Sequence, residues 1–277
     1  MAIFHLTVKA GTRAKGTVAA RKADYIQREN QYEKQPDACL YKESGNLPDW
    51  AENGRDYWQA ADQFERANGR LFVEVEFALP RDLSQDEQLE LARTYAHDLT
   101  EDNRLPYTLA VHEGRGVNFE QTGGNPHAHL MISERINDGV ERSPEGWFSR
   151  ANREEPSLGG ALKSREFHGG EQITALRERW AERVNHSLEQ AQSLERVSHR
   201  TLEAQGVDRE PSQHIGPPAF WMAERGAQSD RAQMFAQEYG RQRQLEREIG
   251  HVEHQLGELA QERRQELERD YGAGLED

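Results

Sequence analysis

The segment Asn125-Pro-His-Ala-His-Leu-Met-Ile-Ser133 has the alternation of a β-strand that is half buried in a core. Side chains of a strand point alternately to its two faces, so His127 and His129 share one face. Ala128 and Leu130 then point into a hydrophobic core. The segment therefore predicts a strand that presents two histidines on its polar face.

The segment Tyr107-Thr-Leu-Ala-Val-His112 alternates in the same way, with His112 on the polar face. If the two strands are neighbours, His112, His127 and His129 converge on one face of a sheet. Three imidazole nitrogens around an ion with open coordination positions are what metal-assisted chemistry requires. A histidine pair that binds no ligand is the common alternative, and a His-x-His pattern alone does not exclude it.

A third predicted strand supplies two carboxylates. The segment Leu71-Phe-Val-Glu-Val-Glu-Phe-Ala-Leu79 alternates, and Glu74 and Glu76 fall on its outward face. Carboxylates commonly orient the imidazoles of a metal site through hydrogen bonds. An ordinary solvated strand face is the alternative for either glutamate. We therefore expect Glu74 and Glu76 to support catalysis.

The candidate nucleophile is Tyr25, on a helix predicted over residues 17–28 with Thr17 as its N-cap. At helical spacing its neighbours are Arg21, Lys22 and Arg28, cations that favour a phenolate and hold phosphate. A packing role is the alternative for a helical tyrosine. The competing tyrosines, which lack this cationic setting, are Tyr32, Tyr41 and Tyr57.

Charge and composition limit the classes of function that the chain can have. The 277 residues carry a formal net charge of -14, which argues against a generic nucleic-acid binder. The charge is uneven, however, and a local basic surface remains compatible with DNA. The candidate phosphate contacts in the N-terminal segment are Arg13, Lys15, Arg21, Lys22 and Arg28. A second basic group consists of Arg142, Arg150, Arg153, Lys163 and Arg165.

The remaining periodicity predicts an α+β domain with an open antiparallel sheet. Further elements are a strand over 2–8, a basic loop over 11–16, a helix over 56–67, a helix opened by the Ser84–Glu87 capping box, and an amphipathic helix over 171–191. The single cysteine and the lack of a long apolar run predict a cytoplasmic protein.

Ordered sequence blocks at residues 1–7, 22–28, 67–80, 105–112, 125–135 and 199–217 resemble the MobA/MobL family of conjugative relaxases, which belong to the His-hydrophobe-His (HUH) endonucleases. The resemblance implies Tyr25 as nucleophile and His112, His127 and His129 as metal ligands. It also implies a ferredoxin-like two-layer fold with helices on one side of a central antiparallel sheet. We expect a relaxase domain over 1–220 and a charged helical extension over 221–277.

The expected activity is metal-dependent, site- and strand-specific nicking and rejoining of DNA at a plasmid origin of transfer, through a 5′-phosphotyrosyl intermediate on Tyr25. The expected cofactor is a divalent ion, Mg²⁺ or Mn²⁺. The expected partners are single-stranded DNA with an adjacent hairpin, mobilisation accessory proteins and a coupling protein. Two alternatives are a rolling-circle replication initiator and a non-catalytic DNA-binding accessory protein. Tyr25 precedes the His-x-His pattern, which is the relaxase order.

Overall fold

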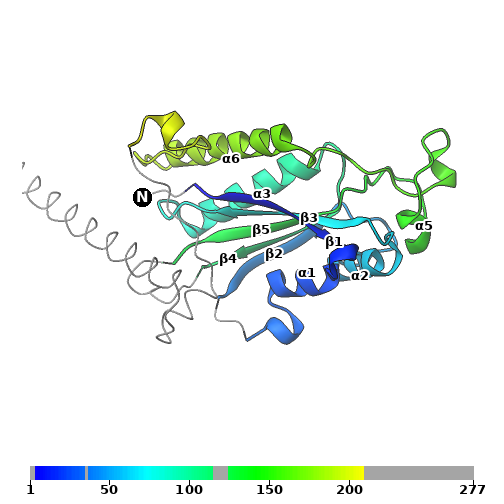
Figure 1. Cartoon of the computed structure of the whole chain (residues 1–277). Coiled ribbons are helices and arrows are strands. Elements are labelled where there is room, and N and C mark those ends of the chain that lie inside the picture. The colour runs from blue at the N-terminus through cyan, green and yellow to red at the C-terminus, as the bar shows by residue number, and fades with distance from the viewer. Residues whose placement is uncertain (1–3, 35–36, 115–123, 209–277) are drawn as a thin grey trace, which may run out of the picture. The chain divides into compact units, whose positions relative to one another are not determined.

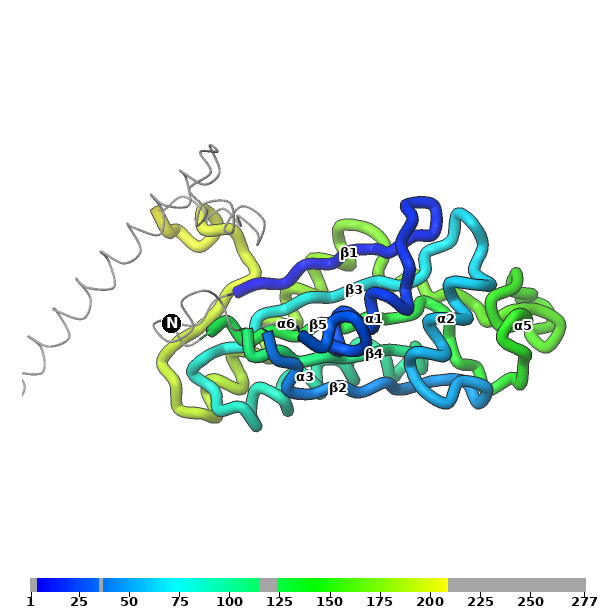
Figure 2. Tube along the Cα trace, turned by 90° about the horizontal axis from the view of Figure 1, so that it is seen from below, coloured from blue at the N-terminus to red at the C-terminus, as the bar shows by residue number. Residues whose placement is uncertain are grey.

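The structure is a computed structural model that describes residues 4–34, 37–114 and 124–208. Its centre is an antiparallel five-stranded sheet with the order β1-β3-β5-β4-β2, which Figure 2 shows face on. The strands are β1 (Leu6–Thr12), β2 (Cys39–Gly45), β3 (Arg70–Ala78), β4 (Tyr107–His112) and β5 (His127–Ile132). The predicted α+β class and central antiparallel sheet are confirmed.

Helices cover both faces of this sheet. The α-helices are α1 (Ala19–Gln27), α2 (Gly54–Phe64), α3 (Gln85–Thr100), α5 (Pro144–Phe148) and α6 (Gly170–Gln190). The short 3₁₀ helices are η1 (Arg13–Lys15), η2 (Asn30–Tyr32), η3 (Pro156–Leu158) and η4 (Glu203–Gln205). Helices α3 and α6 lie on one face, and α1 and α2 lie on the other (Figure 1). The expectation of helices on one side is therefore incomplete.

The strand alternation divides the interior into two cores. Ala128, Leu130 and Ile132 of β5 lie in the core shared with α3 and α6. Met131 lies in the core shared with α1, α2 and α5, because its side chain points to the opposite face. His127 and His129 share the parity of Met131, so the histidines belong to the face that α1 and α2 cover, as the alternation predicts.

Strand β1 runs further than the sequence indicates. The sequence predicts a strand over 2–8 and a loop from Gly11, but Gly11 lies inside β1 and pairs with Phe72 of β3. A Cβ added at Gly11 would lie 2.4 Å from the Phe72 ring. The aromatic ring therefore packs against bare glycine backbone, and this cross-strand contact keeps the strand intact.

The prediction of Thr17 as the N-cap of α1 is wrong. The N-cap is Val18, whose side chain makes no capping hydrogen bond. The carboxylate of Asp62 in α2 instead accepts hydrogen bonds from the backbone N–H groups of Ala19 (2.7 Å) and Ala20 (2.9 Å). A carboxylate at this end also interacts favourably with the helix dipole. A tertiary contact therefore fixes the start of the helix that carries Tyr25.

Local capping signals set the other helix starts. Helix α2 begins two residues before its predicted range of 56–67, because the Asn53 side chain accepts a hydrogen bond from the backbone of Asp56. The capping box of Ser84 and Glu87 is present at the start of α3, as predicted. Helix α6 matches its predicted range to within one residue at each end.

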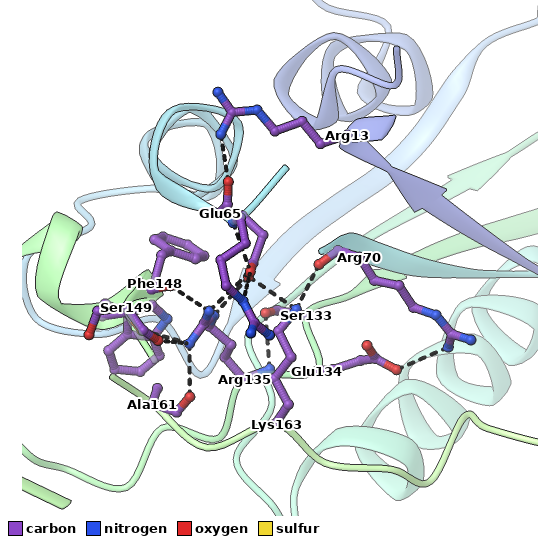
Figure 3. Close-up of polar contacts among 12 residues, drawn as sticks. Arg13, Glu65, Arg70, Ser133, Glu134, Arg135, Phe148, Ser149, Ala161 and Lys163 are labelled. Carbon is purple, nitrogen blue, oxygen red and sulfur yellow. Dashed lines mark hydrogen bonds and ion pairs between the residues drawn. The ribbon is translucent and has the colours of Figure 1, made fainter. Parts of the chain in front are cut away.

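A buried ionic network joins α2 to the segment after β5 (Figure 3). The Arg135 residue is 2% exposed, and its side chain contacts Glu65 through Nε–Oε2 (2.9 Å) and Nη2–Oε1 (3.1 Å). Lys163 Nζ lies 3.0 Å from the same carboxylate. The guanidinium also donates to backbone carbonyls of Trp147, Phe148, Ser149 and Ala161. One arginine therefore satisfies a carboxylate and the carbonyls of two loop segments.

The described residues up to Thr201 form one compact unit, and a second unit begins at Leu202. Within the second unit the structure describes only residues 202–208, which include η4. The predicted helical extension over 221–277 lies outside the described residues. Among the residues that the structure describes, no helix combines the length and hydrophobicity needed to cross a membrane.

Replacement of Arg135 by methionine tests this network. The Arg135→Met variant leaves the buried carbonyls without donors and weakens the pairing of Glu65, so the free energy of unfolding falls by about 3–5 kcal/mol. Urea unfolding followed by tryptophan fluorescence measures the change. The control is Arg177→Met on the exposed face of α6, which changes stability by less than about 0.5 kcal/mol. A loss below about 1 kcal/mol in Arg135→Met would contradict the structural role of the network.

Candidate active site

Strand pairing brings three histidines together. His112, the last residue of β4, pairs with His127, the first residue of β5, and His129 lies two residues further along. The ring centroids are 5.0–5.1 Å apart in all three pairs. One nitrogen of each ring lies within 4.8 Å of the others. The structure therefore brings together all three histidines that the sequence nominates as metal ligands.

Hydrogen bonds orient each ring of this cluster. The contacts are His112 Nε2 to Ile26 O (2.5 Å), His127 Nδ1 to Asn125 O (2.9 Å) and His129 Nδ1 to Glu74 Oε1 (2.9 Å). Carbonyl and carboxylate oxygens only accept, so each of these nitrogens carries the proton. The other nitrogen of each neutral ring then keeps a lone pair: Nδ1 of His112 and Nε2 of His127 and His129. This is the arrangement that metal-ligating histidines require.

The charge state of the cluster fits the same arrangement. Burial and the nearby charge of His129 lower the pKa of His127 to about 4, so its imidazole is neutral near neutral pH. Burial opposes ionisation of Glu74, but its hydrogen bond with His129 and the charge of Lys22 lower the pKa of Glu74 to about 2. The Glu74 carboxylate therefore accepts a hydrogen bond from His129 Nδ1, which leaves Nε2 of that ring free to donate a lone pair.

Asp37 is a site residue that sequence reasoning missed. Its Oδ2 atom lies 3.3 Å from His112 Nδ1 and 3.9 Å from His127 Nε2, the lone-pair nitrogens of those rings. Its Oδ1 atom accepts a hydrogen bond from the backbone of Gly114 (2.8 Å). Burial raises the pKa of Asp37, but a hydrogen bond from the protonated form of His112 and the charge of protonated His127 lower it to about 2. The cluster thus offers a carboxylate oxygen beside two of its nitrogens.

Tyr25 lies at the edge of the cluster between two cations. The tyrosine is 37% exposed, so its ring is accessible to a ligand. Lys22 Nζ lies 5.2 Å and Arg28 Cζ 4.8 Å from the centre of the ring. Lys22 contacts Glu74 at 2.6 Å, and Arg28 Nη2 donates to His112 Nδ1 at 3.2 Å. Each cation therefore links Tyr25 to a different part of the histidine cluster.

The end of α1 determines the position of Arg28. It follows the last helical residue and has a left-handed backbone conformation, with φ of 56°. Its side chain turns back to donate to Tyr25 O and pairs with Asp37 at 3.1 Å. Helices that end in this conformation usually have glycine or asparagine at that position, so an arginine there is uncommon. Its contacts with Asp37 and His112 hold the guanidinium in the site.

The two glutamates of β3 have different partners. Glu74 is buried and bonds both His129 and Lys22. Glu76 pairs with Lys9 of the neighbouring strand β1 at 2.9 Å. A second group that is able to hold a metal consists of Glu74, Glu76 and His129. The hydrogen bond from His129 makes Glu74 the carboxylate that orients the histidine cluster.

The N-terminal cations separate into groups. Lys22 and Arg28 lie beside Tyr25, whereas Lys15 and Arg21 are exposed. Arg13 has a structural role, because its guanidinium donates to the carbonyls of Gln63 and Glu65 at the end of α2 (Figure 3). Those carbonyls have no partner within the helix.

The competing tyrosines occupy less suitable positions. Tyr57 is fully buried and burial raises its pKa to about 12. Tyr41 donates to Glu43 at 2.6 Å, and this hydrogen bond together with burial raises the pKa of Tyr41. Tyr32 contacts the edge of the Tyr25 ring, with 5.3 Å between ring centroids, and is therefore the nearest competitor.

The antiparallel sheet thus places a His-x-His strand opposite a third histidine, with Tyr25 on a helix beside them. The MobA/MobL family model matches residues 2–225. The chain belongs to the MobA/MobL family.

The chain is similar to several known proteins, among them two bacterial relatives and one solved structure. Mobilization protein A of Escherichia coli is 51% identical over 232 residues, 84% of this chain and 32% of that protein. The 43 kDa relaxation protein of Salmonella typhimurium is 43% identical over 218 residues, 76% of this chain and 57% of that protein. The chain thus spans about a third to just over half of these relatives.

The solved structure, described as "Molecular Basis of Vancomycin Resistance Transfer in Staphylococcus aureus", has a TM-score of 0.54 and 24% identity to this chain. The match covers 72% of this chain and 100% of that one. At this identity the likeness shows a common fold.

The different roles of Glu74 and Glu76 are testable by metal binding. Glu74→Ala removes the acceptor that fixes His129, so Mn²⁺ affinity falls by about 10- to 100-fold. Glu74→Gln keeps an acceptor and retains most of the affinity. Glu76→Ala, the matched control on the same strand face, changes affinity by less than about threefold. Titration calorimetry measures all three. A larger loss in Glu76→Ala than in Glu74→Ala would place the ion on the glutamates.

Proposed function

We propose that this chain is the catalytic part of a relaxase, which nicks and rejoins one DNA strand at a plasmid origin of transfer. The observation that carries the proposal is the pair of cations, Lys22 and Arg28, that connect the exposed Tyr25 to three convergent histidines. A nucleophile, phosphate-binding cations and metal-ligand nitrogens in one place are the parts that phosphoryl transfer needs. The relatives named for mobilisation and relaxation support this function.

The Tyr25 oxygen attacks the scissile phosphorus in line with the departing 3′-oxygen. The Tyr25 hydroxyl releases its proton to solvent, the new bond joins Tyr25 Oη to the 5′-phosphate, and the P–O3′ bond breaks. The 3′-oxygen takes a proton from solvent and leaves as a hydroxyl. Lys22 and Arg28 neutralise charge on the phosphate oxygens. Because a phosphotyrosyl ester bond replaces the broken one, attack by a 3′-hydroxyl on the same phosphorus releases the Tyr25 hydroxyl and rejoins the strand.

The three lone-pair nitrogens of His112, His127 and His129 fit a divalent metal ion. A bound ion supplies Lewis-acid polarisation of the phosphate oxygens. Imidazole donors favour transition ions over Mg²⁺, so of the two expected ions Mn²⁺ suits this donor set better. Glu74 and the carbonyls of Ile26 and Asn125 hold the rings in the orientation that binding requires.

The proposed substrate is single-stranded DNA near the nick, with an adjacent hairpin. We further propose a relaxase domain over 1–220 and an extension over 221–277 that docks with other proteins. Mobilisation accessory proteins and a coupling protein are the proposed partners, and the cytoplasm, where plasmid DNA resides, is the proposed location. Lys15 and Arg21 are exposed and are proposed to contact DNA phosphates.

Two other functions lead to different observations. A replication initiator uses the same chemistry, but its cognate sequence lies at an origin of replication. A non-catalytic accessory protein binds DNA without cleaving it. Cleavage of labelled oligonucleotides taken from DNA that flanks the gene separates all three. The Tyr25 position ahead of the His-x-His pattern favours the relaxase.

The role of Tyr25 is tested by removing its oxygen alone. Tyr25→Phe reduces cleavage by about 10³-fold or more and abolishes the covalent adduct, because no nucleophile remains. Oligonucleotide binding stays within about threefold of the wild type, since both cations and the ring are kept. Gel separation of cleaved strand and mass spectrometry of the adduct peptide measure the outcomes.

Tyr32→Phe is the matched control, because its ring touches that of Tyr25 and its loss should leave cleavage intact. An adduct on Tyr32, Tyr41 or Tyr57, or normal cleavage by Tyr25→Phe, would refute the assignment.

A further inference from the structure

Arg28 uses the same lone pair of His112 that the proposed metal site requires. His112 Nε2 donates to Ile26 O, so Nδ1 is the ring nitrogen that carries the lone pair. Arg28 Nη2 lies 3.2 Å from this Nδ1 atom and donates to it. One lone pair accepts a hydrogen bond or binds an ion, but it cannot do both. The contact with Arg28 and the coordination of an ion by His112 Nδ1 are therefore mutually exclusive.

The same guanidinium nitrogen compensates a carboxylate beside the ring. Asp37 Oδ2 lies 3.3 Å from His112 Nδ1. A carboxylate oxygen and an imidazole lone pair are both acceptors, so they repel each other at this distance unless a donor lies between them. Arg28 Nη2 supplies that donor, because it lies 3.1 Å from Asp37 Oδ2 as well as 3.2 Å from His112 Nδ1. A positively charged group therefore already occupies the space between an oxygen and a nitrogen that both favour a cation.

Backbone contacts hold the guanidinium in this position. Arg28 Nε donates to Asp37 O (2.9 Å), and Arg28 Nη1 donates to Tyr25 O (2.5 Å). The guanidinium is planar and its N–H groups have fixed directions, so these two contacts also fix the direction of Nη2. The Arg28 side chain is 10% exposed, and His112 is fully buried. The arginine is therefore a strong competitor for the lone pair, and it is the partner with access to solvent.

The other cation beside Tyr25 makes no such contact. Lys22 Nζ lies 2.6 Å from Glu74 Oε1, and this carboxylate accepts a hydrogen bond from Nδ1 of His129. Lys22 thus acts on the side of the cluster where the nitrogen is protonated, which leaves His129 Nε2 available. Of the two cations, Arg28 is the one that competes directly for a proposed ligand nitrogen.

We propose that Arg28 competes with the metal ion for His112, and that all three histidines bind the ion only after Arg28 Nη2 has left Nδ1. The inference rests on the proposed function and specifies how its metal site is regulated. Arg28 lies beside the Tyr25 ring, so its release provides a cation where the proposed reaction requires phosphate contacts. Ion binding and DNA binding are then linked through one side chain, and each increases the affinity for the other.

A double-mutant cycle of Arg28→Asn and His112→Ala tests the competition. Asparagine readily adopts the left-handed conformation of this helix end, so the variant removes the guanidinium and keeps the turn. Zn²⁺ is the probe, because imidazoles bind it more tightly than Mn²⁺ and the two remaining histidines retain measurable affinity. Titration calorimetry without DNA measures Zn²⁺ affinity, and thermal unfolding verifies that each variant folds.

Arg28→Asn should bind Zn²⁺ about 10- to 100-fold more tightly than the wild type, because the His112 lone pair no longer has a competitor. Loss of a positive charge also favours a cation, and the His112→Ala background measures that contribution alone. In that background the gain from Arg28→Asn should be at least about fivefold smaller. An equal gain in both backgrounds, or no gain in Arg28→Asn, would overturn the proposal.

The linkage to DNA is measured in the Tyr25→Phe background, in which the strand is not cleaved. The probe is a single-stranded oligonucleotide taken from DNA that flanks the gene. Zn²⁺ should increase the affinity for this strand at least about fivefold more in Tyr25→Phe than in the double variant with Arg28→Asn. Equal increases would contradict the linkage through Arg28.

Cleavage of the same oligonucleotide by the wild type tests the relaxase function separately. If no Tyr25 adduct forms but the cycle shows the competition, the nicking mechanism is refuted and the role of Arg28 stands. If Tyr25 cleaves normally and the cycle shows no competition, the role of Arg28 alone is refuted.

Discussion

The antiparallel pairing of β4 with β5 is the constraint on which the site depends. Its register places His112 opposite His127, and the two-residue period of β5 adds His129 on the same face. A shift of one residue would turn these histidines into the α3 and α6 core and expose Leu130. The cost of exposing that core therefore protects the geometry of the cluster. Burial on the opposite face of the sheet is what keeps the histidine face in register.

Each ionic group around the cluster has a partner that fixes its role. Glu74 and two backbone carbonyls select the protonated nitrogen of each ring, and Asp37 neutralises Arg28 beside them. Helix α1 supplies both cations near Tyr25, and its start is held by Asp62 from α2. The proposed nucleophile is thus positioned by a helix whose cap comes from another helix. The Arg135 network then connects the end of α2 to α5 and to Ala161.

Features that depend on local periodicity were predictable from the sequence, whereas features that depend on tertiary contact were not. Alternation located four of the five strands and the shared face of the histidines, but β2 was not predicted. The capping box of Ser84 and Glu87 located the start of α3. Thr17 was wrong as a cap because Asp62, 45 residues later, takes that position. The sequence predicts Gly11 in a loop, whereas in the structure it lies in β1 with the Phe72 ring packed against it. Asp37 has no periodic neighbour, and only the pairing of β2 with β4 brings it to His112.

A crystal structure with Mn²⁺, located by its anomalous scattering, tests the central claim most directly. The account predicts one ion bound by Nδ1 of His112 and Nε2 of both His127 and His129, with Nδ1 of His129 still on Glu74. The Tyr25 oxygen should face the open side of that ion. An ion bound by Glu74 and Glu76, or by the opposite nitrogens of the three rings, would contradict the hydrogen-bond assignments on which the account is built.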